Sequence, residues 1–396
     1  MGKTHFGKKL IFVFLAFFLS VTLLEFGLRI AFFIKDSLDK KRESRFDLFQ
    51  EEEKALKRAT GINEPWIGEV LDETEKTRDM EFQPFTVWRS KEFHGKYVNL
   101  SPAGIRKTWN INQKINDVKK VYCFGGSTLW GFYVRDDYTI ASLLSKELYN
   151  NGYKNYYVEN FGEKAYSSTQ GLMQLILLLK EGDVPDYVIF YDGANDVYIA
   201  SEEDGEPGTI INLKELRLKA SKKEMSDIQM FTKGLGKYIE HTSGIRRVIK
   251  LLRNKKRLAK SSENKNGILE SNTRLVNVSE EAINKYLENV VFLEKLAKTY
   301  GFKVKCFWQP VLYYARPEAL SLEQESYKRH KVFAKLYEKA YSLIASRKDL
   351  PKDFINLSDI FYSLKEPVYI DFCHLSEKGN EIIVKEMFNR IKVDLQ

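Results

Sequence analysis

The stretch Val121-Tyr122-Cys123-Phe124-Gly125-Gly126-Ser127-Thr128 decides the fold class of this 396-residue chain. Four consecutive apolar residues followed by two glycines indicate a buried strand that enters a tight turn. Helical spacing follows from Ile140 to Leu148, so this part of the chain predicts a strand, a turn and a helix in that order. Such an alternation is typical of a parallel sheet that helices cover on both faces.

The same alternation continues toward the C-terminus. Further strands are predicted at Tyr156–Val158, Tyr187–Tyr191, Phe302–Trp308 and Phe354–Leu357, and further helices at about 169–179, 280–300, 322–346 and 377–391. Ser279 stands where an N-cap is expected, Gly301 stands where a helix would end, and the last helix follows Ser376. We therefore expect an α/β fold with three layers, doubly wound around about five parallel strands.

The N-terminus has the pattern of a membrane segment. Three lysines precede an apolar run over 10–24, and apolar character resumes over 26–34. Glu25 and Arg29 are four residues apart, so on a helix they can pair, and the combined run then reaches the about 20 residues that a span needs. A cleaved signal peptide is the alternative, but large residues stand where a cleavage site would need small ones. We predict that residues 1–35 form a single transmembrane helix that anchors the chain.

Basic residues flank the apolar run on both sides, so counting charges does not set its orientation. A short tail before a large domain favours export of that domain, and we expect it on the periplasmic or extracellular side of the membrane. Residues 36–81 are rich in charge and predict a helical, solvated stalk. The main domain is expected over 82–396, and its first part, 82–109, should pack on the rest as an apron of short extended stretches.

Residues 200–275 interrupt the alternation of strands and helices. They are polar and basic, and the spacing over 245–253 predicts an amphipathic helix. Two interpretations stay open. The segment is either a helical insertion on the domain surface, or a lid or membrane-surface contact near the functional site.

Composition narrows the classes of function. The formal net charge is +9, but the basic residues are spread along the chain and no nucleic-acid module is present, so we expect no nucleic-acid partner. The chain has three cysteines, an odd number that argues against a disulfide framework. Cys123 and Cys306 stand in apolar runs and fit small residues of the core. No spacing resembles a zinc site, and we expect neither a metal nor another cofactor. The oligomeric state is left open by the sequence.

Three polar turns follow the first three predicted strands. Ser127 comes after the first, Gly162 after the second and Asn195 after the third. Ligand sites of open parallel sheets lie at the carboxyl ends of the strands, so these turns should converge on one crevice. Asp192 and Asp196 flank the third turn, where they are expected to act as caps or turn residues, or else to bind substrate.

A serine hydroxyl is a weak nucleophile unless a base removes its proton. His374 is the candidate base, because Asp371 stands three residues earlier and can orient the imidazole; the other four histidines lack such a neighbour. The backbone N–H of Ser127, a backbone N–H near Gly162 and the side-chain amide of Asn195 could bind an oxyanion. Cys373, beside the histidine, is interpreted as a spectator.

Four segments resemble the sequence blocks of the SGNH (GDSL-like) hydrolase superfamily over roughly 119–393, without the insertion. They are Phe124-Gly125-Gly126-Ser127-Thr128, Glu159-Asn160-Phe161-Gly162, Gly193-Ala194-Asn195-Asp196 and Asp371-Phe372-Cys373-His374. The resemblance implies a flavodoxin-like sheet, a Ser127–His374–Asp371 triad, and Ser127, Gly162 and Asn195 as oxyanion donors.

The resemblance implies that the protein is a serine esterase. Because the chain is expected to be anchored and exported, its substrate would be an O-acyl ester on a cell-envelope glycan or lipid. Two alternatives stay open. One is an O-acyltransferase that uses the same triad, and the other is a non-catalytic envelope binding protein that kept the fold.

Overall fold

The structure is a computed structural model, and it describes residues 17, 19–20, 23–28, 30, 45–61, 63–111, 117–202, 206–220, 272–315 and 331–395. The contacts divide the chain into two units, residues 1–48 with 220–271, and residues 49–219 with 272–396. The second unit holds the sheet and the candidate site. The predicted amphipathic helix at 245–253, and most of the 200–275 insertion with it, lies outside the described residues.

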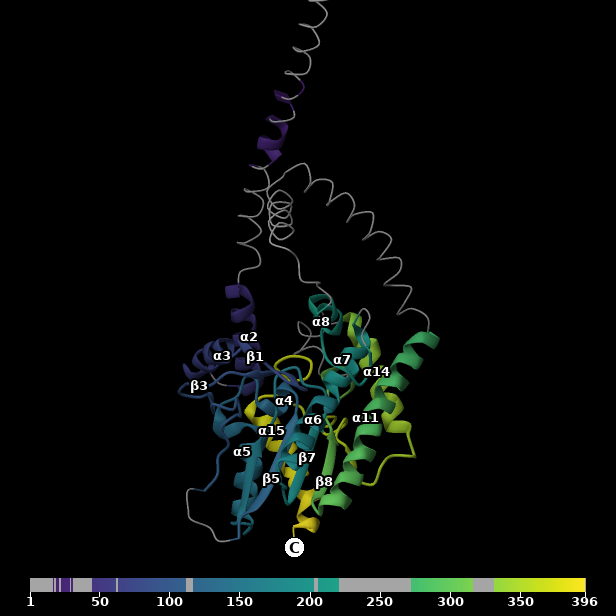
Figure 1. The fold of residues 1–396 in the computed structure, drawn as a ribbon. Coiled ribbons are helices and arrows are strands. Elements are labelled where there is room, and N and C mark those ends of the chain that lie inside the picture. The colour runs from purple at the N-terminus through teal and green to yellow at the C-terminus, as the bar shows by residue number, and fades with distance from the viewer. Residues whose placement is uncertain are drawn as a thin grey trace, which may run out of the picture. The chain divides into compact units, whose positions relative to one another are not determined.

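A five-stranded sheet forms the centre of the second unit, in the order β6-β5-β7-β8-β9 (Figure 1). Its strands are β5 (Lys119–Gly125), β6 (Tyr156–Asn160), β7 (Tyr187–Asp192), β8 (Lys303–Trp308) and β9 (Phe354–Asn356). Every neighbouring pair is parallel. The prediction of about five parallel strands is confirmed. The chain places β6 on one side of β5 and then crosses back to place β7 on the other side, so the direction of winding reverses there.

Helices cover both faces of this sheet. The helices beyond the N-terminal region are α4 (Ser127–Trp130), α5 (Ile140–Asn150), α6 (Ser168–Lys180), α7 (Ala194–Ser201), α8 (Leu213–Ala220), α11 (Asn272–Tyr300), α12 (Leu312–Ala315), α14 (Lys331–Ser346) and α15 (Glu377–Ile391), with 3-10 turns η1 (Asp136–Tyr138) and η2 (Lys392–Asp394). One face of β5 and β7 shares a core with α5 and α15, where Cys123 and Ile189 meet Leu144 and Ile383.

Aromatic side chains fill the opposite face. Phe124 of β5 stacks on Phe190 of β7 with ring centroids 5.1 Å apart. Trp308 of β8 contacts Tyr286 of α11 at 4.8 Å and Tyr341 of α14 at 5.1 Å. The strand residues thus alternate between two buried faces, which is why these strands read as continuous apolar runs.

The predicted start of the helix that ends near Tyr300 is wrong. Helix α11 begins at Asn272, so Ser279 lies inside it and is fully buried instead of capping it. Leu275 and Ile283 are buried four residues to either side of Ser279, so the apolar stripe simply continues through it. The predicted end is confirmed, because Gly301 adopts a left-handed φ of +84°. Helix α15 follows Ser376 as predicted, and Ser376 caps it by accepting a hydrogen bond from the Gly379 N–H.

The predicted solvated stalk is wrong for its described C-terminal part. Helices α2 (Arg45–Thr60) and α3 (Trp66–Lys76) are present, but Leu56, Trp66, Ile67 and Val70 are buried in one cluster with Trp130. Charged residues surround this short apolar stripe, and their number conceals it. This segment is therefore part of the main domain, and residues 36–44 lie outside the described residues.

Four short strands follow α3 and form the apron that the sequence predicts. Strands β1 (Met80–Gln83) and β2 (Val87–Ser90) make one antiparallel hairpin, and β3 (Phe93–His94) pairs with β4 (Asn99–Leu100). The first hairpin is joined to the main domain by buried contacts, because Glu163 accepts hydrogen bonds from the Ser90 N–H at 2.8 Å and the Ser90 hydroxyl at 2.7 Å.

The predicted transmembrane helix at 1–35 falls mostly on residues that the structure does not describe. Within the described part of the chain, no helix has both the length and the apolar character that a membrane crossing requires.

Candidate active site

Ser127 is the first residue of the four-residue helix α4, directly after β5 and the Gly125-Gly126 turn. The turn is tight because β5 is buried between its neighbours: a side chain at Gly125 would meet the Tyr191 carbonyl oxygen at 2.4 Å. The first N–H groups of a helix have no acceptor within it, so the Ser127 N–H faces away from the helix body. Strand, turn and helix together place the Ser127 hydroxyl at the carboxyl end of the sheet.

The structure brings Ser127, His374 and Asp371 together. Oγ of Ser127 lies 2.7 Å from Nε2 of His374, and Nδ1 of His374 lies 2.6 Å from Oδ2 of Asp371. An ionised carboxylate can only accept a hydrogen bond, so Nδ1 carries the proton of the neutral imidazole. Nε2 is then an acceptor, and the Ser127 hydroxyl donates to it. This is the geometry in which an imidazole can remove the proton of a serine.

Asp371 is held as a carboxylate by its surroundings. Its Oδ1 accepts hydrogen bonds from the backbone N–H of Cys373 at 2.9 Å and of His374 at 2.8 Å. Burial alone would raise the pKa of this carboxyl, but the charge and hydrogen bonds of His374, together with the Cys373 N–H, outweigh burial and lower the pKa to about 2. The carboxylate is therefore ionised at any pH near neutrality.

This low pKa makes a prediction about acid stability. The pKa of Asp371 is about 2 in the folded chain against an ordinary value of 3.8, so ionisation favours the folded state by about 2 kcal/mol above pH 4. That contribution is lost as the pH falls through the folded pKa. Urea unfolding of the wild type and of Asp371→Asn should differ most above pH 5 and converge only as the pH falls below about 2. A difference that is constant down to pH 2.5 would contradict the assignment.

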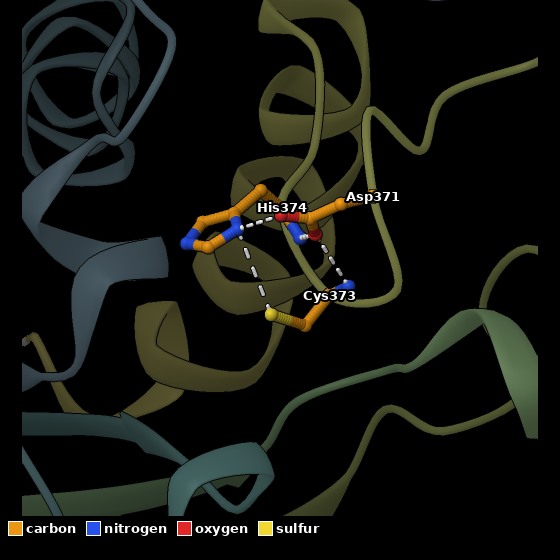
Figure 2. A group of neighbouring side chains, drawn as sticks. All are labelled: Asp371, Cys373 and His374. Atoms are coloured by element: carbon orange, nitrogen blue, oxygen red, sulfur yellow. Dashed lines mark hydrogen bonds and ion pairs between the residues drawn. The ribbon is translucent and has the colours of Figure 1, made fainter. Parts of the chain in front are cut away.

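Cys373 completes a group of three potential metal ligands, drawn in Figure 2. The ligand atoms of Asp371, Cys373 and His374 lie within 4.8 Å of one another, and Sγ of Cys373 is 3.7 Å from Nδ1 of His374. Nδ1 and Oδ2 are already bonded to each other, however, so a metal ion would have to displace that bond. Burial, aided by the negative charge of Asp371, raises the pKa of the Cys373 thiol well above 9.0, which keeps it protonated and unsuited to act as a nucleophile.

Asn195, one of the three predicted oxyanion donors, lies beside the turn that holds Ser127. It is the second residue of α7, after β7 and Gly193. Its Nδ2 donates to the Tyr166 carbonyl oxygen at 2.7 Å, and a Cβ at Gly126 would lie only 2.5 Å from Nδ2. An amide nitrogen carries two hydrogens, so one N–H remains for a ligand at the turn.

Because Asn195 approaches Gly126 so closely, we expect the substitution Gly126→Ala to lower kcat. The φ of Gly126 is −81°, which alanine accepts, so the cost comes from the new methyl group, which would lie 2.5 Å from Nδ2 of Asn195 and 3.2 Å from the Tyr166 carbonyl oxygen. We expect kcat to fall about 10- to 100-fold, part of the about 10²- to 10³-fold that loss of one oxyanion donor costs. The matched control is Gly68→Ala on α3, where a Cβ meets nothing within 4 Å. An unchanged kcat in Gly126→Ala would show that Asn195 can move without effect.

Gly162 lies in the same region, but its amide is engaged. The Gly162 N–H donates to Oδ1 of Asn160 at 3.0 Å, and Nδ2 of Asn160 donates to the Leu129 carbonyl oxygen at 3.0 Å. Asn160 therefore holds the Gly162 loop against α4, a role that no local sequence pattern indicates. Donation by Gly162 to an oxyanion requires its N–H to leave Asn160, and that role stays a prediction.

Asp192 and Asp196 are both buried behind the Asn195 turn. Asp196 accepts a hydrogen bond from the Ser168 hydroxyl at 2.6 Å and from the Ser168 N–H at 3.2 Å, so it anchors the first turn of α6. This contact agrees with the interpretation of Asp196 as a capping or turn residue. Burial raises the pKa of the Asp192 carboxyl well above 3.8, and the neighbouring charge of Asp196 adds to that shift.

The loop after α4 supplies two contacts with the imidazole that the sequence did not suggest. The ring of Phe132 lies 5.1 Å from the ring of His374, and that of Tyr133 lies 5.5 Å from it at an interplanar angle of 85°. Tyr133 has a φ of +72°, which is a strained conformation for a bulky residue and costs on the order of 1–3 kcal/mol. Two aromatic residues after Gly131 give no sequence signal for either the contacts with His374 or the strained backbone.

The N-terminal hairpin supports the opposite side of the site. Nε1 of Trp88 donates to the Lys164 carbonyl oxygen at 3.0 Å, and the Tyr166 hydroxyl donates to the Trp88 carbonyl oxygen. Tyr166 is the residue whose own carbonyl oxygen holds Asn195. The β1–β2 hairpin therefore fixes the loop that positions the third predicted donor, through contacts that no sequence motif marks.

Comparison with known proteins gives structural similarity alone. No family model matches the sequence, and no curated protein matches it. An acetylxylan esterase from Geobacillus stearothermophilus is 13% identical and covers 70% of this chain and 96% of its own, with a TM-score of 0.33. A lipase/acylhydrolase from Enterococcus faecalis is 16% identical and covers 70% of this chain and 98% of its own, also at 0.33.

A third similar structure is a member of the lipolytic G-D-S-L family from Veillonella parvula. It is 11% identical and covers 69% of this chain and 97% of its own, with a TM-score of 0.34. The structural neighbours are thus esterases and acylhydrolases by description, at identities and TM-scores too low to place this chain in their family.

Proposed function

We propose that the protein is a serine-dependent ester hydrolase, with Ser127 as nucleophile, His374 as general base and Asp371 as the residue that orients and stabilises the imidazolium. One observation carries this proposal: the continuous hydrogen-bond chain from Oγ of Ser127 through His374 to Asp371, at 2.7 and 2.6 Å. A serine, a histidine and an aspartate in this order are the elements of a triad, whatever fold holds them.

The reaction would proceed in two halves. Oγ of Ser127 attacks the ester carbonyl carbon while Nε2 of His374 takes the hydroxyl proton, and the imidazolium returns that proton to the leaving alcohol. Water then attacks the acyl-enzyme, with His374 again as base, and releases the acid and the free serine. The Ser127 N–H and the unused N–H of Asn195 would bind the oxyanion of both tetrahedral intermediates.

The test is covalent labelling of the full-length chain by a fluorophosphonate probe, followed by hydrolysis of esters of graded acyl length. The expected result is one labelled site and turnover of at least one ester class. A wild-type chain that is neither labelled nor active would contradict the esterase and support the alternative of a non-catalytic binding protein.

As substrate we propose an O-acyl ester on a cell-envelope glycan or lipid. The support is the apolar, Lys-flanked segment over 10–34, which would hold the domain at a membrane. Acetylated glycans and long-chain acyl lipids should be compared with and without added sugar acceptor. Release of free acid supports the hydrolase, and acyl transfer to the sugar would support an O-acyltransferase instead.

The membrane anchor itself is part of the proposal. We expect the full-length chain to stay in membranes washed with alkaline carbonate, and the domain to be digested by protease added on the periplasmic or extracellular side. Release of the chain by carbonate would contradict the anchor, and protection from protease would contradict its orientation.

A further inference from the structure

The strained residue Tyr133 is the starting point. It follows α4 and Gly131, and its φ of +72° lies in the left-handed region that bulky residues rarely adopt. Such a conformation persists only where several contacts hold it in place, and it is concentrated at functional sites. Tyr133 is only 5% exposed, so neighbouring residues surround it on nearly all sides.

Two partners hold Tyr133, one at each end of its side chain. Its ring stands nearly perpendicular to the imidazole of His374, with centroids 5.5 Å apart. Its hydroxyl donates to Oε1 of Glu52 at 2.9 Å. Glu52 belongs to α2, in the segment that the sequence suggested to be a stalk, so a carboxylate far from the triad in sequence is linked to the triad through one side chain.

Arg78 closes the same cluster from the end of α3. Its guanidinium lies 3.9 Å from Oε1 of Glu52 and stacks over the Phe132 ring at 5.4 Å. Phe132 in turn lies 5.1 Å from the His374 ring. Glu52 is thus fixed by a cation and a hydroxyl, and the imidazole is bounded by two rings whose outer sides are held by the N-terminal helices.

We propose that Glu52 and Tyr133 are positioning residues for His374: the carboxylate of α2 holds the Tyr133 hydroxyl, and the Tyr133 ring holds the imidazole within reach of Ser127. This inference rests on the proposed function. The N-terminal helical segment then completes the active site, and it does so by fixing the base and not by touching the substrate.

The test separates the hydroxyl, the acceptor and the charge. Tyr133→Phe keeps the ring and removes the hydroxyl, Glu52→Ala removes the acceptor, and Glu52→Gln keeps an acceptor without the charge. We expect kcat to fall about tenfold in Tyr133→Phe and in Glu52→Ala, with KM within twofold of wild type, since an imidazole displaced by less than 1 Å should cost less than 10²-fold. Glu52→Gln should retain at least a third of the wild-type kcat.

The double variant Glu52→Ala/Tyr133→Phe provides the decisive comparison. Because the two residues act through one hydrogen bond, the double variant should also lose about tenfold in kcat and not about 100-fold. Every rate is divided by the number of active sites titrated with the fluorophosphonate probe, so partly unfolded protein does not count. Glu53→Gln is the matched control, because Glu53 lies on the same helix and pairs with Lys57 at 2.7 Å.

The outcomes are distinct. Loss of kcat per titrated site in both single variants, without further loss in the double variant, supports the inference. Unchanged kcat per titrated site, or losses that multiply, would overturn it and leave the esterase proposal intact. A wild-type chain that the probe does not label would overturn both.

Discussion

Ser127→Ala is expected to abolish labelling by the fluorophosphonate probe and to lower kcat by at least about 10⁴-fold, the scale on which removal of a triad nucleophile acts. The Ser127 hydroxyl is the group that lies 2.7 Å from the candidate base, and alanine leaves nothing there to form the acyl-enzyme. Substrate binding should be little affected, so KM or the dissociation constant of a product should stay within a fewfold of wild type. Labelling stoichiometry and initial rates on the best ester measure both effects.

Ser342→Ala is the control for this experiment. Ser342 lies on α14 and its hydroxyl donates only to the Glu338 carbonyl oxygen, at 2.7 Å on the surface. Its replacement should change neither labelling nor rate. If Ser127→Ala still reacted with the probe, another nucleophile would have to be sought. Cys373 would be the first to examine, although burial keeps its thiol protonated.

Asp371→Asn should lower kcat by about 10²- to 10⁴-fold with little change in KM. The Asp371 carboxylate accepts from Nδ1 of His374 at 2.6 Å and so keeps Nε2 free to act as base. An asparagine amide can donate to Nδ1 instead, which favours the tautomer with its proton on Nε2, and that tautomer cannot accept the serine proton. Steady-state kinetics at pH 7 to 8 measure the loss.

The matched control is Asp349→Asn, since Asp349 pairs with Arg347 on the surface at 2.8 Å. It should keep wild-type kinetics. An Asp371→Asn variant within threefold of wild type would mean that His374 needs no carboxylate, and the assignment of the third triad member would fail.

The sheet was predictable because its central strands, β5 and β7 above all, are buried on both faces. Apolar runs such as Tyr187–Tyr191 have no polar alternation to confuse their assignment, and each ends in a glycine-bearing or polar turn. The turn residues Ser127, Gly162 and Asn195 followed from the same logic, since parallel strands end at one edge. His374 followed instead from the carboxylate of Asp371 three residues before it. Helix α15 was predicted with its bounds, Glu377–Ile391, because helical apolar spacing follows Ser376.

The N-terminal region could not be predicted in the same way. Only a narrow stripe of α2 and α3, including Leu56 and Ile67, is apolar, and the charged residues around it dominate the local composition. Whether such a stripe meets a partner depends on residues far away, here Trp130 and its neighbours. The same holds for Tyr133 and Glu52: a contact across 81 positions leaves no mark in either local pattern.

The separation of Ser127 and His374 in the chain has a consequence for how the molecule becomes reactive. The two residues are 247 positions apart, and the histidine stands in the turn before the last α-helix, α15. A folding intermediate with β5, β6 and β7 already paired would hold the serine without its base. Contacts of such long range form slowly, so probe reactivity should return with the final phase of refolding, later than the bulk of the helical signal.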